Sequence, residues 1–196
     1  MGTNRLEAFS DGVIAIIITI MVLELRPPHE ASLHGLVGLG PVALSYVLSF
    51  MVVAIMWVNH HHLVRSARRA DARLLWANNH LLFWMSLIPF ATNFLGENPL
   101  EPAAIALYGG VLACGSVSFS LLRGAVVRQH AGDADMRQYH GKILRKNWIS
   151  VGLYLTAVAG AWLSVYFSYF IFILVPALYF LPERGVAEAG RERTAE

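Results

Sequence analysis

The chain has 196 residues, of which 56% are hydrophobic and 14% charged, and its formal net charge is +2 at pH 7. Soluble domains carry about a quarter of their residues as charged side chains, so this composition excludes a water-soluble core as the main interpretation. The apolar residues lie in long blocks separated by charges, glycine or proline, which indicates a membrane protein.

Six blocks approach the length of about 20 apolar residues that a helix needs to cross the hydrocarbon core. They predict an all-α membrane protein with six transmembrane helices, running approximately Arg5 to Leu25, Leu36 to Val64, Leu74 to Leu95, Pro102 to Val127, Trp148 to Ser164 and Tyr166 to Leu181. The last two blocks are almost contiguous, which predicts a hairpin turning around Val165. We expect one transmembrane domain over residues 1–182 and a charged, disordered cytoplasmic tail over 183–196, since that stretch has too few apolar residues to fold alone.

Lysine and arginine predict the orientation, because positive charges near span ends are retained in the cytoplasm. If both termini are cytoplasmic, fourteen of the fifteen basic residues fall inside and only Arg26 falls outside. A basic loop is expected from Arg123 to Lys146, and it indicates topology and contact with anionic lipids rather than with nucleic acid. We therefore expect a multi-pass protein of the cell membrane, with membrane lipids as partners and no nucleic-acid partner.

The first block carries a stripe of residues at helical spacing. At 100° per residue, one face of this helix collects Arg5, Phe9, Gly12, Ile16, Thr19 and Leu23. The spacing suits packing around a central axis, with the Thr19 hydroxyl between the apolar layers of Ile16 and Leu23. The alternative is an ordinary helix-packing seam in which Thr19 bonds to its own backbone.

A short motif opens the same helix. Arg5, Phe9, Ser10, Asp11 and Gly12 form the pattern Arg-x-x-x-Phe-Ser-Asp-Gly. The pattern resembles the signature of the transmembrane protein 175 family, the lysosomal and prokaryotic potassium channels. The resemblance continues through the segments Trp57-Val-Asn59-His60-His61-His62, Trp76-Ala-Asn78-Asn79-His80 and Ile88-Pro89-Phe90. It covers most of the chain, and it is specific over the first ninety-odd residues and rests on hydropathy beyond them.

The resemblance implies a potassium-selective or potassium-preferring cation channel that conducts passively, with its pore lined by the first helix around a central symmetry axis. In the family, the positions that match Ile16 and Leu23 form hydrophobic constrictions, and the position that matches Thr19 contributes to potassium preference. Prokaryotic members have four subunits, and this chain shows one repeat, so a homotetramer is implied. Potassium is the permeant ion, and no cofactor is implied.

Asp11 lies away from the stripe and is expected to face other helices. A carboxylate at membrane depth costs at least ~2.5 kcal/mol unless it is paired. The family places the Ser-Asp pair against side chains of the next two helices, where the available partners are Trp57, Asn59, His60, His61, Trp76, Asn78, Asn79 and His80. The alternative is a proton-coupled carrier that uses Asp11 and the nearby histidines as a proton relay.

Other chemistry finds little support in the sequence. The adjacent histidines 60–62 point about 100° apart on a helix and cannot all bind one ion, so no metal site is predicted. Phosphate-binding loops, dinucleotide-binding turns and serine nucleophile elbows do not occur, so we expect no enzyme, although a membrane enzyme with a buried histidine site is a third alternative. No Thr-Val-Gly-Tyr-Gly filter occurs either, and any ion selectivity must come from side chains of the first helix.

Overall fold

The computed structural model describes residues 3–28, 31–130 and 132–180, and every regular element within them is a helix. The helices are α1 (Thr3–Leu23), α2 (Leu33–Gly38), α3 (Gly40–Arg65), α4 (Ala72–Ser86), α5 (Ile88–Glu97), α6 (Pro102–Arg128), α7 (Ala134–Gly160) and α8 (Val165–Phe180). The all-α fold class predicted from the sequence is confirmed. The predicted tail, 183–196, lies outside the described residues.

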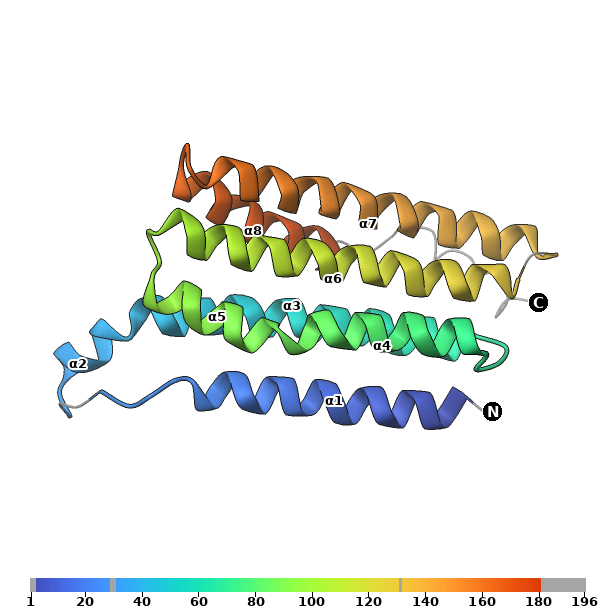
Figure 1. Cartoon of the computed structure of the whole chain (residues 1–196), viewed down its shortest axis with the longest axis horizontal. Coiled ribbons are helices and arrows are strands. Elements are labelled where there is room, and N and C mark those ends of the chain that lie inside the picture. The colour runs from blue at the N-terminus through green and yellow to red at the C-terminus, as the bar shows by residue number, and fades with distance from the viewer. Residues whose placement is uncertain (1–2, 29–30, 131, 181–196) are drawn as a thin grey trace, which may run out of the picture.

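The long helices run alongside one another in layers (Figure 1). α1 lies on one side, α3 and the α4–α5 pair form the next layer, α6 follows, and α7 and α8 lie on the far side. α4 and α5 continue one another through Leu87 and together occupy the place of the predicted third span. The interruption has a local cause, because Pro89 has no backbone N–H to donate to the carbonyl of Met85.

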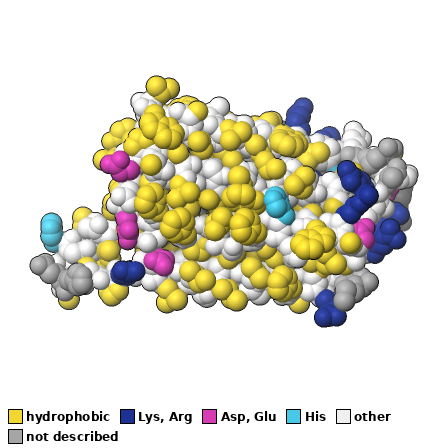
Figure 2. All heavy atoms as spheres, in the orientation of Figure 1, with side chains coloured by type: hydrophobic (Ala, Val, Ile, Leu, Met, Phe, Trp, Pro, Cys, Tyr) yellow, Lys and Arg dark blue, Asp and Glu magenta, His cyan; other side chains and the backbone are white. Residues whose placement is uncertain are grey.

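Three helices of the described residues, α1, α3 and α6, are long and apolar enough to cross a membrane. α8 is apolar but has only 16 residues, and α4 and α5 are each shorter than a span. The surface in Figure 2 is largely hydrophobic along the middle of the molecule. Lysine and arginine gather mainly at the end of the molecule where α1 begins. Several acidic side chains lie at the opposite end, where α2 is. This distribution is that of a helical membrane protein.

The predicted boundaries are wrong near the C-terminal helices. α7 begins at Ala134, where Asp133 caps it by accepting a hydrogen bond from the Met136 backbone N–H at 3.0 Å, and not at Trp148. The predicted basic loop from Arg123 to Lys146 is therefore mostly helix, and only the short connection after Arg128 is not. The hairpin turns at residues 161–164, just before Val165 rather than around it.

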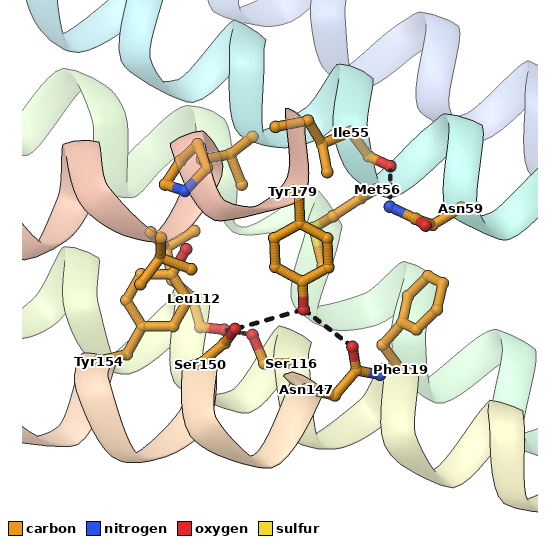
Figure 3. A pocket seen from close by; sticks show the side chains of 13 residues that line it. Ile55, Met56, Asn59, Leu112, Ser116, Phe119, Asn147, Ser150, Tyr154 and Tyr179 are labelled. Atoms are coloured by element: carbon orange, nitrogen blue, oxygen red, sulfur yellow. Dashed lines mark hydrogen bonds between the residues drawn. The ribbon is translucent and has the colours of Figure 1, made fainter. Parts of the chain in front are cut away.

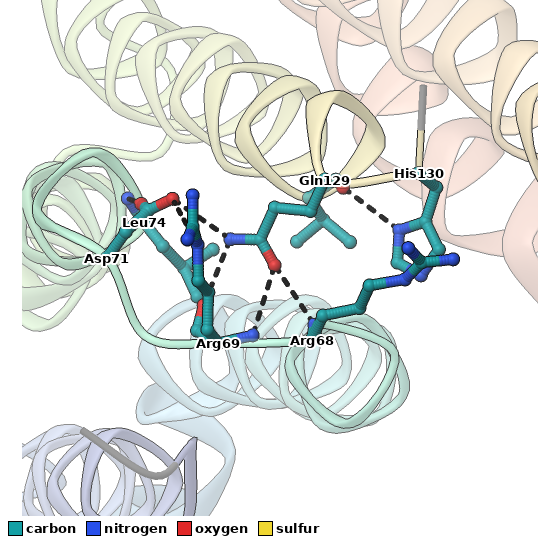
Figure 4. A network of polar contacts seen from close by, with 7 residues as sticks. Arg68, Arg69, Asp71, Leu74, Gln129 and His130 are labelled. Carbon is teal, nitrogen blue, oxygen red and sulfur yellow. Dashed lines mark hydrogen bonds and ion pairs between the residues drawn. The ribbon is translucent and has the colours of Figure 1, made fainter. Parts of the chain in front are cut away.

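Gln129 ties the end of α6 to the loop between α3 and α4 (Figure 4). Its Oε1 accepts from the backbone N–H groups of Arg68 and Arg69 at 2.9 and 3.2 Å, and its Nε2 donates to the Arg69 carbonyl at 2.9 Å. Asp71, in the same loop, caps α4 by accepting a hydrogen bond from the Leu74 backbone N–H at 2.9 Å. This hydrogen bond, followed by that of Gln129, lowers the pKa of the Asp71 carboxyl. One amide side chain thereby fixes the start of α4 relative to α6.

Candidate functional site

The stripe on α1 lies on the open surface of the single chain. Phe9 is 58% exposed, Ile16 57% and Leu23 76%. A side chain at Gly12 would meet nothing within 4 Å. The opposite face of the helix is packed against α3, α4 and α5 through Leu6, Ser10, Ile14, Ile17 and Met21. Among the residues that the structure describes, α1 is therefore held by one face only, and nothing covers the face with the predicted pore residues.

Thr19 is exposed on this stripe, and its hydroxyl donates to the Ile16 carbonyl at 2.8 Å. This is the backbone bond that the helix-seam alternative expects. The same bond uses the only hydrogen of the hydroxyl, so the lone pairs of Oγ1 are left for an outside donor or a cation. A ring of such oxygens could coordinate a partly dehydrated cation, and the geometry of one chain is compatible with both interpretations.

A buried polar cluster fixes the other face of α1. Ser10, His60 and Asn78 are each 0% exposed and come from α1, α3 and α4. Asn78 Nδ2 donates to Ser10 Oγ at 3.0 Å, and Asn78 Oδ1 lies 2.7 Å from His60 Nε2. Since Oδ1 can only accept, Nε2 carries the proton of the His60 ring. The Ser10 hydroxyl in turn donates to the Leu6 carbonyl at 2.8 Å, so one asparagine joins three helices.

A second set of polar contacts lies nearer the surface between α1 and α3. Trp57 Nε1 donates to Asp11 Oδ1 at 2.9 Å, and His61 Nδ1 lies 2.8 Å from Glu7 Oε1. Glu7 and Asp11 are four residues apart on α1, and Trp57 and His61 are four residues apart on α3. One face of α1 therefore meets one face of α3 in antiparallel register. Glu7 was missed by the sequence analysis. Its spacing from Asp11, equal to that of Trp57 from His61, was the signal that could have identified it.

The remaining predicted partners do not join these contacts. Asn59 donates to the Ile55 carbonyl of its own helix at 2.8 Å, and His80 accepts from Trp84 Nε1 at 3.3 Å. Trp76 is 75% exposed, Asn79 is also exposed, and Arg5 lies exposed on the α1 stripe. Within the described ranges, no group of three or more His, Cys, Asp or Glu side chains is placed to hold a metal ion.

Comparison with known proteins places this arrangement among channels. The family described as "Endosomal/lysosomal potassium channel TMEM175" matches residues 5–89. A potassium channel from Chryseobacterium sp. is 36% identical over 193 residues, which cover 98% of this chain and 100% of the relative. A potassium channel from Chamaesiphon minutus is 33% identical, with 91% of this chain and 93% of the relative covered.

A solved structure has the same fold. The crystal structure of a lysosomal potassium-selective channel TMEM175 homolog from Chamaesiphon minutus superposes with a TM-score of 0.80 at 31% identity, covering 91% of this chain and 96% of that one. The similarity therefore extends well beyond the N-terminal motif, through the helices that sequence reasoning matched only by hydropathy.

Proposed function

Because the chain belongs to the TMEM175 family, we propose that it is a subunit of a potassium channel that conducts passively and is lined by α1. The uncovered stripe on α1 is the observation that carries this proposal. An apolar helix that is packed on one face and open on the other requires further cover, either from lipid or from other copies of the chain. Neighbouring copies of α1 would bring the stripe residues to a common axis.

One chain cannot enclose a pore, so the proposal includes a closed cyclic assembly, and we propose a homotetramer. In this assembly Ile16 and Leu23 repeat by symmetry as apolar rings that narrow the path and limit its hydration. Thr19 lies between them and supplies a ring of oxygens, which is the only polar layer at that depth on the stripe. Gly12 widens the path one turn earlier, since it adds no side chain.

The polar contacts of α1 serve this proposal by setting the rotation of the helix. Ser10 is held by Asn78, and Asp11 by Trp57, on faces away from the stripe. A turn of α1 about its axis would break both contacts and would move Ile16 and Thr19 off the axis. The motif residues Ser10 and Asp11 are thus positioning residues, and the ion path is formed by their neighbours.

The charge distribution supports six membrane crossings in a cell membrane, with both termini in the cytoplasm. Figure 2 shows lysine and arginine mainly at the end where α1 begins, as expected of the cytoplasmic side. The shorter elements complete the count in this proposal: α4 with α5 makes one crossing, the second half of α7 makes another, and α8 the last.

The runner-up is a proton-coupled carrier, and one contact favours it. His61 and Glu7 form an acid–base pair at 2.8 Å beside Asp11, and such pairs occur in proton relays. A carrier must move protons together with potassium, whereas a passive channel does not. The two proposals therefore differ in a single measurable requirement.

The test is ion flux from proteoliposomes that contain the purified protein and a potassium gradient but no proton gradient. The channel proposal expects potassium efflux that a protonophore leaves unchanged once the membrane potential is clamped. The carrier also responds to the potassium gradient, but it moves protons with the potassium, so the internal pH changes together with the flux, which the channel does not produce once the potential is clamped. Liposomes with Gly109→Leu, which disrupts packing far from α1 (see Discussion), serve as the control for leak through misfolded protein.

A further inference from the structure

A small cavity lies between α3, α6, α7 and α8 (Figure 3). Its volume is about 50 Å³. One water molecule needs on the order of 10–15 Å³ of such space, so the cavity has room for about three waters and is too small for a lipid chain. Among the described residues, those that line it belong neither to the stripe on α1 nor to the Ser10–Asn78–His60 cluster.

The wall of the cavity is partly apolar and partly polar. Buried apolar side chains form most of it, among them Val52, Leu112, Phe119, Tyr154 and Val175. Polar side chains reach it from all four helices: Asn59 of α3, Ser116 of α6, Asn147 and Ser150 of α7, and Tyr179 of α8. A purely apolar cavity stays dry, whereas a cavity with polar groups on several sides can hold water.

One hydrogen-bond donor on this wall has no partner. Asn147 is 3% exposed, and its Nδ2 has no hydrogen-bond partner among the described residues. Its Oδ1 accepts from the Tyr179 hydroxyl at 2.8 Å, a distance typical of an O–H donor. Nδ2 is therefore the end of the amide that is turned away from Tyr179 (Figure 3). A buried N–H₂ group needs an acceptor, because otherwise it keeps its full desolvation penalty.

Two other polar groups of the wall offer acceptors. The Ser116 hydroxyl donates to the Leu112 carbonyl of its own helix at 2.9 Å. This bond uses its only hydrogen, and the lone pairs of Oγ can still accept. Asn59 Nδ2 donates to the Ile55 carbonyl at 2.8 Å, and Asn59 Oδ1 can accept as well. One donor and two acceptors, from three helices, thus border a space of about three waters.

We propose that the cavity holds a short chain of ordered water molecules that joins α7 to α6 and α3. One water accepts from Asn147 Nδ2, and the chain donates to Ser116 Oγ and Asn59 Oδ1. Water suits this wall because it accepts and donates at once, and a bridging water is nearly as favourable as a direct hydrogen bond. The three helices are then linked by polar contacts where their side chains do not meet directly.

A metal cation fits the same wall poorly. The N–H₂ of Asn147 presents hydrogens and no lone pair to an occupant. A positive charge is also close, because Lys146 Nζ lies 4.6 Å from the centre of the Tyr179 ring, and Tyr179 lines the cavity. Water has no net charge, so the chemistry of the wall favours it over a sodium or potassium ion.

The water chain would connect the C-terminal hairpin to the helix that holds α1. Asn59 directly precedes His60 on α3, and His60 Nε2 lies 2.7 Å from Asn78 Oδ1 in the cluster that holds α1. α3 thus carries the cluster at one residue and the water site at the residue before it. The water site requires neither a pore nor ion conduction, so it can be tested separately from the proposed channel.

The experiment is X-ray hydroxyl-radical footprinting of the full-length protein in nanodiscs, read by mass spectrometry. X-ray pulses convert water into hydroxyl radicals, which oxidise the aromatic side chains next to that water. Phe119 and Tyr154 line the cavity and are 6% and 4% exposed. Tyr108 and Phe172 are both 0% exposed and lie outside the lining, so they are the internal controls. We expect the first two residues to be oxidised several-fold faster than the controls.

Filling the cavity separates internal water from bulk solvent. Ser116→Leu occupies the space and should lower the oxidation of Phe119 and Tyr154 to the level of Phe172. The matched control is Ser86→Leu, because Ser86 is exposed on α4 and also donates to a carbonyl of its own helix, at 2.7 Å. It should leave the pattern as in the wild type. Misfolding would raise the oxidation of both internal controls, so it cannot imitate the expected fall.

The role of the amide is tested by Asn147→Leu, which removes the donor and should also lower the oxidation of Phe119 and Tyr154. Asn93→Leu on α5, outside the cavity, is its control and should have no effect. Equal oxidation of the two cavity residues in the wild type and in Ser116→Leu overturns the proposal, because bulk solvent would then be the source. Oxidation in the wild type as slow as that of the internal controls also overturns it, because the cavity would then be dry.

Discussion

α1 and α6 are both long apolar helices able to cross a membrane, yet they are packed in opposite ways. α6 contacts α3, α4, α5, α7 and α8, and it buries most of its circumference, including Tyr108, Leu112 and Leu122, while Leu121 on the remaining face is exposed. α1 contacts the body by one face and leaves Ile16 and Leu23 on the surface. Apolar composition therefore predicts a place in the membrane, but it does not predict whether protein, lipid or another subunit covers the helix.

The serine side chains of the two helices also differ in their partners. In α6, Ser116, Ser118 and Ser120 each donate to a carbonyl four residues earlier on their own helix, so these bonds place no demand on neighbours. In α1, Ser10 and Asp11 take their partners from α3 and α4. α6 also has directed contacts, from Tyr108 to Ser49 on α3 at 3.0 Å and from Arg123 to His140 on α7 at 3.1 Å, but it packs against five helices, whereas α1 is held by one face. Substitutions should have different consequences in the two helices.

The largest effect is expected at Gly109 in α6. A Cβ at this position would lie 2.9 Å from Val158 Cγ2 and 3.2 Å from the Phe172 ring. Gly109→Leu should therefore destabilise the subunit by about 3 kcal/mol through overpacking. The matched control is Gly110→Leu, because a Cβ there meets nothing within 4 Å. Thermal unfolding in detergent measures both, and equal melting temperatures would show that α6 is not closely packed.

The next effect is the release of α1 by Asn78→Leu. Loss of the amide leaves the buried His60 Nε2–H and the Ser10 hydroxyl without their partner, at a cost of about 2 kcal/mol. The adjacent Asn79 is exposed, so Asn79→Leu is the control. Hydrogen exchange should rise in residues 3–23 for the first variant and not for the second. Unchanged protection of α1 would mean that its apolar contacts alone hold it.

These directed contacts also show what could be predicted from the sequence. The family resemblance of the motif implied that Ser10 and Asp11 meet side chains of the next two helices, but not which ones. Asn78 and Trp57 are the partners, whereas Asn59 and His80 bond within their own helices. The choice depends on the rotation of α3 and α4, and apolar residues around the whole circumference of α3 give no periodicity from which to read it.

The start of α7 was mispredicted for a different reason. A search for long apolar blocks excludes the polar residues from Ala134 onward, so it places the helix start too late. The buried positions of α7 nevertheless follow a helical stripe, most of them three or four residues apart: His140, Ile143, Asn147, Ser150, Val151, Tyr154 and Ala157. This amphipathic stripe packs on α6 and was present in the sequence. Asn147, in the middle of it, was missed with it.

The exposed face of α1 is tested by Ile16→Asn. In the proposed pore this change places a hydrated side chain in a ring that otherwise excludes water, so conductance should rise about tenfold and ion discrimination should weaken. Ile16→Val retains an apolar ring and should change little. Single-channel recording in bilayers measures both variants. Wild-type current and selectivity in Ile16→Asn would mean that α1 is rotated away from the axis.

The stability of the protein is expected to depend on pH through the contact between α6 and α7, at the end of the molecule remote from α2. His140, on the polar first half of α7 outside the predicted span, is 2% exposed, and Arg123 lies 3.1 Å from its Nδ1. Burial, followed by the charges of Arg123 and His130, lowers the pKa of His140 to about 4. The unfolded chain takes up the proton near pH 6.5, so stability is full above that pH and is lost as the pH falls toward 4.

The measurement is the melting temperature at pH 7 and pH 5. Wild type should lose stability on the order of 1 kcal/mol more than His140→Gln, which does not titrate and can still accept from Arg123. His34→Gln, at a histidine far from α6, should behave as the wild type. An identical pH dependence in wild type and His140→Gln would place the acid sensitivity elsewhere.

The smallest expected effect separates the two interpretations of Thr19. Thr19→Val keeps the shape of the side chain and removes the hydroxyl, so the Oγ1 lone pairs that face away from the Ile16 carbonyl are lost while the helix keeps its backbone bonds. In a pore, a ring of oxygens disappears, and the preference for potassium over sodium should fall about threefold, ~0.7 kcal/mol. In a helix-packing seam, the same change leaves selectivity unaltered and affects only stability.

Reversal potentials in mixed potassium and sodium gradients measure the ratio of potassium to sodium permeability. Thr156→Val is the control, because Thr156 is also exposed and also bonds to its own helix. A changed ratio in Thr19→Val alone would show that the open face of α1 meets the ion.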